Sequence, residues 1–251
     1  MIERSERDGI AVISLTHGKA NTMDLELCQT MIDAFDELSS SSAKAVVLTG
    51  QGRIFSAGVD LLRTHAGGPT YVRQFLPLLN KMFAAVFQFP RPVVAAINGH
   101  AIAGGCVLAC CADYRLMAQG DGRIGVTELL VGLPFPALAF EVMRLTTTPR
   151  FLAQAIYRGG TCSPDEALAC GWVHEVVAPS LLMEEAFKVA AHLAGLPPNT
   201  FVATKRQLHM PAIERLERDG DRIDAAVTDV WAAPEASARI RAYVERTLKK
   251  R

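Results

Sequence analysis

Five short apolar runs divide the chain and predict buried strands, at residues 10–15, 44–49, 93–97, 114–118 and 172–177. Two longer segments between them, 23–38 and 71–87, repeat apolar residues at helical spacing. In the first of these segments, Leu27, Met31 and Leu38 share one face. Strands that alternate with helices are typical of βαβ units and a mostly parallel sheet, so we expect an α/β fold.

A further helix is predicted by its capping residues. In the sequence Ser163-Pro164-Asp165-Glu166, the serine suits the N-cap, the proline suits the first turn and the glutamate completes a capping box. Gly171 is placed to end this helix. After about residue 196 the strand pattern stops and only helical segments follow. We therefore expect a core over 1–195 and a C-terminal helical oligomerisation region over 196–251, packed on the core or on a neighbouring subunit.

Composition excludes several classes of protein. Half of the 251 residues are hydrophobic, and 26 basic residues balance 26 acidic ones, so no nucleic-acid footprint is expected. The basic tail 249–251 is interpreted as a solvated helix end. Six cysteines without a C-x-x-C pair favour neither a metal site nor a disulfide framework, which suits a reducing, cytoplasmic setting.

Targeting and membrane segments are also not expected. Residues 1–9 are charged, and the apolar run after them is too short for a signal peptide. Segment 92–112 has no charged residue, but Asn98, His100 and glycines interrupt it. A strand, a loop and a buried helix explain this segment better than a bilayer crossing.

Two glycine-bearing segments are the strongest candidates for a site: F-S-A-G-V-D at 55–60 and I-N-G-H-A-I-A-G-G at 97–105. Each follows or ends an apolar run and leads into a helical pattern. Glycine lets backbone N–H groups approach a ligand, and a helix N-terminus adds unpaired donors. Two such junctions that face each other could hold a developing oxyanion. Neither a phosphate-binding G-K-[ST] nor a G-x-S-x-G motif occurs.

These segments resemble motifs of the crotonase (enoyl-CoA hydratase/isomerase) superfamily. F-S-A-G-V-D-L at 55–61 resembles its F-S-A-G-x-D-[IL], and 92–112 resembles its P-V-[VI]-A-A-[IV]-N-G-x-A-x-G-G-G. The later segments 112–115, 124–129 and 167–177 resemble further family elements in the same order. The resemblance implies a crotonase-like spiral of ββα units with a C-terminal helical region, and a homotrimer or hexamer.

The resemblance also implies a site for an acyl-CoA thioester, with coenzyme A as part of the substrate and no metal or other cofactor. The N–H groups of Val59 and Gly104 would bind the thioester oxygen, and Glu128 would be the catalytic acid–base. Residues expected to contact the substrate or its CoA moiety are Lys19, Ala20, Ser56, Ala57, Asp60, Leu61, Ile102, Leu133 and Phe135. Lys205 is a weaker candidate for the CoA phosphates. Asp60 and His100 are expected to hold their loops rather than to react.

The departures from the family pattern favour one reaction. Family hydratases carry a second glutamate three residues after the middle glycine, where this chain has Val107. Adding water needs groups that orient and deprotonate it, which valine cannot do, whereas moving a double bond needs a single base. The apolar run L-P-F-P-A-L at 133–138 replaces a glycine-rich hydratase run and predicts a dry wall. These features are similar to the mitochondrial-type Δ3,Δ2-enoyl-CoA isomerases and predict conversion of 3-enoyl-CoA to 2-enoyl-CoA.

Three alternatives remain at this point. The protein could be an enoyl-CoA hydratase, another crotonase-type enzyme such as a thioesterase, or a non-catalytic acyl-CoA binder. A structural interpretation of Glu128 is also open: Thr127 could cap a short helix, with Glu128 only favouring its N-terminus.

Overall fold

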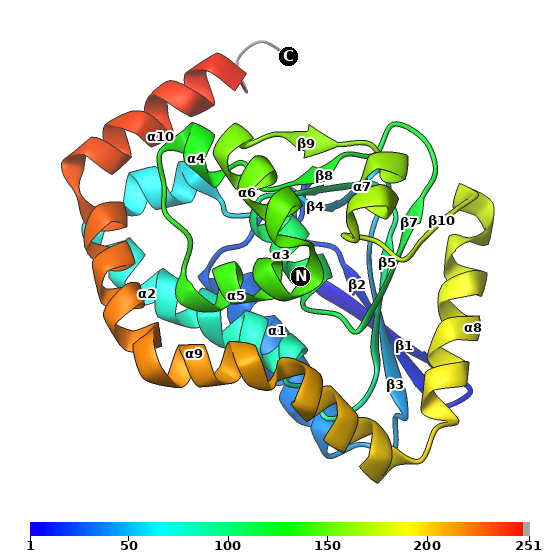
Figure 1. The fold of residues 1–251 in the computed structure, drawn as a ribbon. Coiled ribbons are helices and arrows are strands. Elements are labelled where there is room, and N and C mark those ends of the chain that lie inside the picture. The colour runs from blue at the N-terminus through cyan, green and yellow to red at the C-terminus, as the bar shows by residue number, and fades with distance from the viewer. Residues whose placement is uncertain (248–251) are drawn as a thin grey trace.

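A six-stranded sheet forms the centre of the computed structural model, which describes residues 1–247 (Figure 1). Its strand order is β1-β2-β3-β5-β7-β10, and only the β1–β2 pair is antiparallel. The strands are β1 (Ile2–Arg7), β2 (Ile10–Leu15), β3 (Ala45–Gly50), β5 (Val93–Ile97), β7 (Tyr114–Ala118) and β10 (Glu175–Val177). The central strands are buried on both faces, which explains why they read as continuous apolar runs.

A second sheet of four short strands lies beside the first, in the order β4-β6-β8-β9. Its strands are β4 (Ile54–Ser56), β6 (His100–Ile102), β8 (Ile124–Gly125) and β9 (Thr161–Cys162). Three strands of the large sheet are each followed by one of the small sheet and then by a helix, giving β3-β4-α2, β5-β6-α3 and β7-β8-α4. This repeated ββα unit confirms the predicted crotonase-like fold class.

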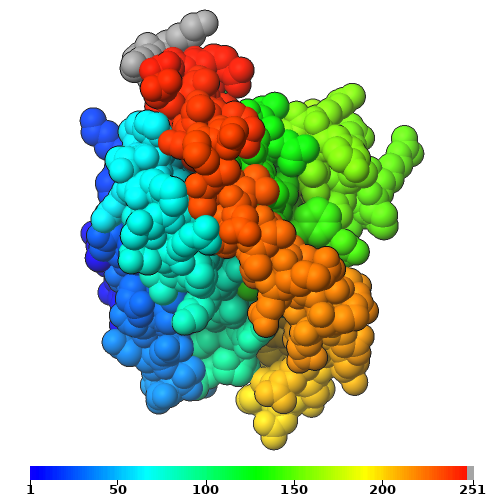
Figure 2. Space-filling model, turned by 90° about the vertical axis from the view of Figure 1, so that its left-hand side faces the viewer, coloured from blue at the N-terminus to red at the C-terminus, as the bar shows by residue number. Residues whose placement is uncertain are grey.

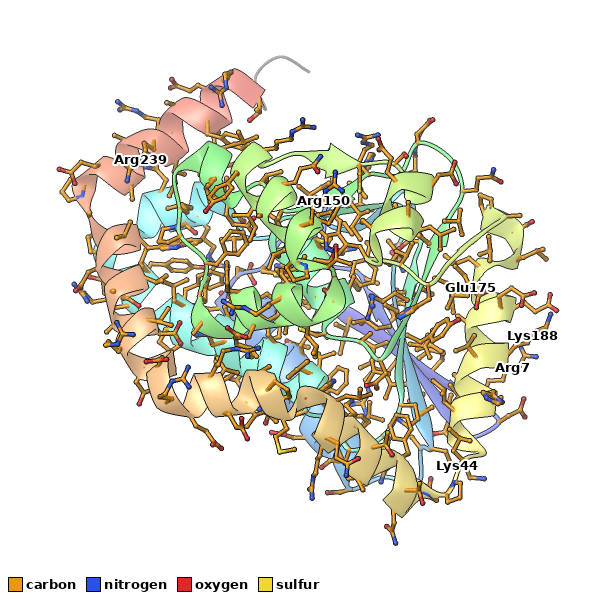
Figure 3. All side chains as sticks on the ribbon, viewed as in Figure 1. Arg7, Lys44, Arg150, Glu175, Lys188 and Arg239 are labelled. Atoms are coloured by element: carbon orange, nitrogen blue, oxygen red, sulfur yellow. The ribbon has the colours of Figure 1, made fainter. Side chains whose placement is uncertain are left out.

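Helices cover both faces of the large sheet. On one face lie α1 (Leu25–Ser39) and α2 (Leu61–Phe87), and on the other lies α8 (Leu182–Ala194), after a 3₁₀ turn at Pro179–Leu181 (Figure 1). Lys188 lies on α8, and Arg7 and Lys44 lie beside this helix (Figure 3). The shorter helices are α3 (Gly104–Cys110), α4 (Glu128–Val131), α5 (Ala137–Thr146), α6 (Pro149–Arg158) and α7 (Pro164–Cys170).

The C-terminal helices pack on the core of their own chain. Helix α9 (Pro198–Ala232) contacts α2 and α5, and α10 (Pro234–Thr247) contacts α2 and α4. In Figure 2 these two helices form a band between the cyan segment that includes α2 and the green segments from the middle of the chain. Packing on the core, one of the two predicted modes, is thus seen within one chain, and packing on a neighbouring subunit stays a prediction. Within residues 1–247, no helix is both long and apolar enough to cross a membrane.

Local sequence signals agree with the structure at several helix ends. Ser163 and Glu166 form the predicted capping box, and Gly171 ends α7 in the left-handed conformation. Helix α1 begins slightly later than predicted because the Asp24 carboxylate caps it, accepting a hydrogen bond from the Leu27 N–H at 2.8 Å. Helix α2 begins before the predicted segment, with a kink where Gly68 adopts φ 60° and ψ −156°.

One predicted strand needs correction, and one observed strand was not predicted. The strand expected at 172–177 is shorter, since the N–H groups of Trp172 and Val173 both donate to the Ala167 carbonyl and complete the end of α7. Strand β1 is not predicted by the hydrophobic pattern because its residues are almost all exposed at the sheet edge. The tail interpreted as a solvated helix end lies outside the described residues. The domain boundary, oligomeric state, metal-free site and cytoplasmic location stay predictions.

Candidate active site

The two glycine segments meet backbone to backbone. A Cβ added to Gly58 would lie 2.7 Å from the Ile102 carbonyl oxygen and 2.9 Å from the Gly104 nitrogen. Gly58 also has φ +82°, a conformation that side chains rarely adopt. Glycine is therefore required here for two reasons. The close approach of the two backbone segments also brings Val59 and Gly104 near each other.

The backbone N–H groups of Val59 and Gly104 are suited to act as donors. Gly104 is the first residue of α3, where a helix leaves N–H groups without an intrahelical partner. Met23 bridges the residues on either side of Val59, donating to the Gly58 carbonyl at 2.8 Å and accepting from the Asp60 N–H at 2.9 Å. This pairing does not use the Val59 N–H. Ala103, directly before Gly104, has φ 53°, and such backbone strain is often found at functional sites.

Buried polar contacts fix the loop that carries Val59. The Ser56 hydroxyl donates to the Asn21 carbonyl at 2.7 Å and accepts from the Gly58 N–H at 3.2 Å. The Ala57 N–H donates to the Ala20 carbonyl at 2.9 Å. At the end of the loop, the Asp60 carboxylate caps α2 by accepting from the Arg63 N–H at 2.9 Å. Val59 is thus held in place from both sides.

A largely apolar cavity of about 90 Å³, called here the acyl pocket, opens beside these donors. The structure brings most of the predicted site residues to its lining: Ala57, Val59, Leu61, Ile102, Gly104, Glu128, Leu133 and Phe135. Four others do not line it. Ser56 and Asp60 lie in the loop that carries Val59, and Ala20 contacts this loop through its carbonyl group. Lys19 is exposed. Contacts of these four with the CoA moiety stay predictions.

Glu128 presents a buried carboxylate to the acyl pocket. Its Oε2 atom is inaccessible to solvent and has no hydrogen-bond partner. Burial raises the pKa of Glu128 from 4.5 to about 7, although backbone N–H groups at Glu128 and Thr127 oppose the change. Thr127 occupies the N-cap position of α4, but its hydroxyl makes no capping bond. A buried carboxylate that lines a cavity and has one oxygen without a partner is a candidate for a functional acid–base.

Val107 lies on the first helix after the glycine segment and lines the same pocket as Glu128. It is fully buried. The pocket therefore presents an isopropyl group from α3, at the position for which the family resemblance predicts a second carboxylate in hydratases.

One predicted contact is wrong. Lys205 cannot meet CoA phosphates from its present position, because its ammonium group is buried and forms an ion pair with Asp113 Oδ2 at 2.9 Å. A lysine in a polar stretch of sequence reads as a surface group, and only the packing of α9 on the core buries it. The expected structural role of His100 is supported, since its Nδ1 accepts from the Arg123 N–H at 3.2 Å.

Sequence reasoning missed three aromatic residues of the acyl pocket: Phe83 of α2 and two residues of the C-terminal helices. Trp231 comes from α9 and Tyr243 from α10, more than a hundred residues after Glu128. The Trp231 Nε1–H donates to the Pro134 carbonyl at 2.9 Å. No local motif marks either residue, because both reach the pocket only through the return of the C-terminal helices across the core.

Comparison with known proteins agrees with this geometry. Residues 5–249 match the enoyl-CoA hydratase/isomerase family. A Thermus thermophilus protein named putative enoyl-CoA hydratase is 32% identical over 96% of both chains. Mouse mitochondrial enoyl-CoA delta isomerase 1 is 27% identical over 100% of this chain and 88% of its own. The human mitochondrial delta3-delta2-enoyl-CoA isomerase structure has the same fold, with a TM-score of 0.94 at 24% identity, covering 100% of this chain and 99% of that one. The chain belongs to the enoyl-CoA hydratase/isomerase family, within the crotonase superfamily.

Proposed function

We propose that this enzyme isomerises 3-enoyl-CoA thioesters to 2-enoyl-CoA thioesters, with Glu128 as the proton carrier. The lining of the acyl pocket is the observation that carries the proposal. Glu128 is the one carboxylic acid among the described lining residues, and Val107 is the described residue of α3 whose side chain lines the same cavity. One base is enough to move a double bond, whereas hydration needs further help to orient and activate water.

The proposed reaction consumes no water, because the proton removed from C2 is returned to C4. The Glu128 carboxylate takes a proton from C2 of the substrate, and the electron pair of that C–H bond spreads over the thioester oxygen and carbons C2 to C4. The N–H groups of Val59 and Gly104 stabilise the negative oxygen, each donor lowering the barrier by about 3–4 kcal/mol. Glu128 then returns the proton to C4, which leaves the double bond between C2 and C3.

The electrostatics of Glu128 support this role. A general base works best when its pKa lies near the working pH, and burial raises the pKa of Glu128 to about 7. The same apolar surroundings disfavour a bound nucleophilic water. Leu133 and Phe135, both buried, line the pocket with apolar side chains, which supports the prediction of a dry wall.

Hydration is the second candidate because the Thermus thermophilus relative carries the name of a hydratase. The two reactions are separated by incubating the purified protein with 3-hexenoyl-CoA and with crotonyl-CoA while the absorbance of the 2-enoyl thioester is followed. Isomerisation predicts a gain of absorbance with 3-hexenoyl-CoA that disappears in Glu128→Gln. Loss of absorbance with crotonyl-CoA, and no gain with 3-hexenoyl-CoA, would overturn the proposal.

Two further measurements in the same experiment address the remaining alternatives. Release of free thiol would indicate a thioesterase. If Glu128→Gln keeps the wild-type rate on every substrate and still binds CoA thioesters, Glu128 is not the base.

A further inference from the structure

Part of the wall of the acyl pocket is built from large buried side chains. Phe83 of α2 and Trp231 of α9 are 1% and 4% exposed, respectively, and both line the cavity. Phe135, which also lines the cavity, is 8% exposed. The pocket therefore ends against side chains that are sealed from solvent, rather than continuing into an open groove along this wall.

Trp231 is fixed in this wall by a hydrogen bond. Its Nε1–H donates to the carbonyl of Pro134, which lies between the lining residues Leu133 and Phe135. The indole is thus tied to the segment that the sequence predicts to be a dry wall. Rotating the ring away would break this bond and leave a buried N–H and a carbonyl without partners.

Helix α9 is itself held against α5 by two further polar contacts. Seven residues before Trp231, the Asp224 Oδ1 atom accepts the Ala137 N–H at 2.7 Å and so caps α5, whose own N-cap residue has no side-chain bond. Asp224 Oδ2 also accepts from Asn80 Nδ2 of α2 at 2.8 Å. Earlier on α9, Arg215 Nε donates to Glu141 Oε2 of α5 at 2.6 Å.

These contacts make the wall a fixed part of the pocket. Asp224 joins α9 to both α2 and α5, which carry Phe83 and Ala139 of the lining. Inserting extra methylene groups against such a packed wall forces side chains off their preferred rotamers. The pocket is thereby limited in the length of chain that it can take.

The volume of the pocket indicates the length of acyl chain that it can hold. An apolar cavity of about 150 Å³ holds one benzene molecule, with its six carbons. By that measure, the acyl pocket of about 90 Å³ has room for roughly four carbon atoms, including the carbonyl carbon beside Val59 and Gly104.

The geometry points to a short-chain thioester of about four acyl carbons as the substrate, with Trp231 as the residue that limits chain length. This inference rests on the function proposed above, since it names the substrate class of the same site. Tyr243 contributes to the same lining, but no hydrogen bond ties its hydroxyl to the wall among the interactions described for residues 1–247. Trp231 is therefore the residue to change.

The first experiment measures kcat/KM for 3-enoyl-CoA thioesters of four, six, eight and ten carbons. Because one methylene in an apolar pocket changes kcat/KM by about 10-fold or more, wild type should prefer the two shorter substrates by at least about tenfold. Trp231→Ala should raise the ratio of the eight-carbon to the four-carbon value by about tenfold or more. Trp231→Leu, which keeps the wall apolar and disturbs it less, should change the ratio in the same direction.

Trp172 provides a matched control. It is the other of the two tryptophans of the chain, it is 1% exposed, and it does not line the acyl pocket. Trp172→Leu should leave the chain-length ratio unchanged even if it lowers stability. An equal change in both variants would assign the effect to general loosening of the fold and overturn the role of Trp231.

A binding series separates this inference from the proposed reaction. Saturated CoA thioesters from butyryl to decanoyl are titrated into Glu128→Gln by calorimetry, which needs no catalysis. Binding should be tightest for the four- or six-carbon thioester, and the optimum should move to longer chains in Glu128→Gln/Trp231→Leu. Binding that strengthens steadily up to decanoyl would overturn the chain-length inference, even if isomerisation is observed. If the enzyme only hydrates 2-enoyl thioesters, the proposed reaction fails while the binding series still decides the substrate length.

Discussion

Glu128→Gln should abolish catalysis and yet gain stability relative to wild type as the pH rises. The wild-type carboxylate lies in an apolar pocket, and its Oε2 atom has no hydrogen-bond partner. Burial raises its pKa from 4.5 to about 7. Between these two values the folded protein keeps the proton while the unfolded chain has lost it. Wild-type stability therefore falls as the pH rises through this window and becomes level above about pH 7.

The size of the effect follows from the pKa change. Raising the pKa from 4.5 to about 7 costs the fully ionised folded state about 3 kcal/mol, at about 1.4 kcal/mol per pKa unit. Most of this cost, about 2–3 kcal/mol, develops between pH 5 and pH 8. Glutamine has nearly the same shape and does not ionise. Any free-energy cost of burying its amide is the same at every pH. The free energy of unfolding of the variant relative to wild type should therefore grow by about 2–3 kcal/mol between pH 5 and pH 8.

Denaturant unfolding of both proteins at pH 5, 6, 7 and 8 measures this difference. Glu214→Gln, which removes an exposed carboxylate from α9, is the control for the loss of a surface charge. The expected result is a free energy of unfolding for Glu128→Gln that gains on wild type only as the pH rises. A stability difference that is the same at pH 5 and pH 8 would refute the argument that Glu128 ionises in a desolvated pocket.

Three other results are expected. In wild type, kcat/KM for isomerisation should fall about tenfold per pH unit below about pH 7 and level off above it, because the base must be deprotonated; a flat rate profile from pH 5 to 8 would contradict Glu128 as the base. Gly58→Ala should lower kcat/KM by about a hundredfold or more, since its Cβ would lie 2.9 Å from the Gly104 nitrogen; near-normal kinetics would refute the proposed donor pair. Lys205→Met should lower the free energy of unfolding by about 3–5 kcal/mol because Asp113 stays buried without its partner. Denaturant unfolding measures this loss, and a loss below about 1 kcal/mol would argue against a stabilising role for the Lys205–Asp113 ion pair.

The predicted strands at 10–15, 93–97 and 114–118 coincide with β2, β5 and β7. Strands buried on both faces are mostly apolar, so their pattern is visible without knowledge of their neighbours, even where β7 includes the buried Arg115. The strands of the small sheet are two or three residues long, which is too short for any periodicity to appear. Only pairing with strands distant in the chain defines them.

The sequence by itself determined which residues are candidates for the backbone half of the site and for its acid–base, through the resemblance of its motifs to those of the family. Gly58, Gly104 and Glu128 stand in short local motifs, which can be read without knowledge of the fold. Tertiary structure decided what surrounds them. It placed Trp231 against the acyl pocket and paired Lys205 with Asp113 in the interior. The burial that raises the pKa of Glu128 is also a product of packing between segments far apart in the chain, and no local pattern records it.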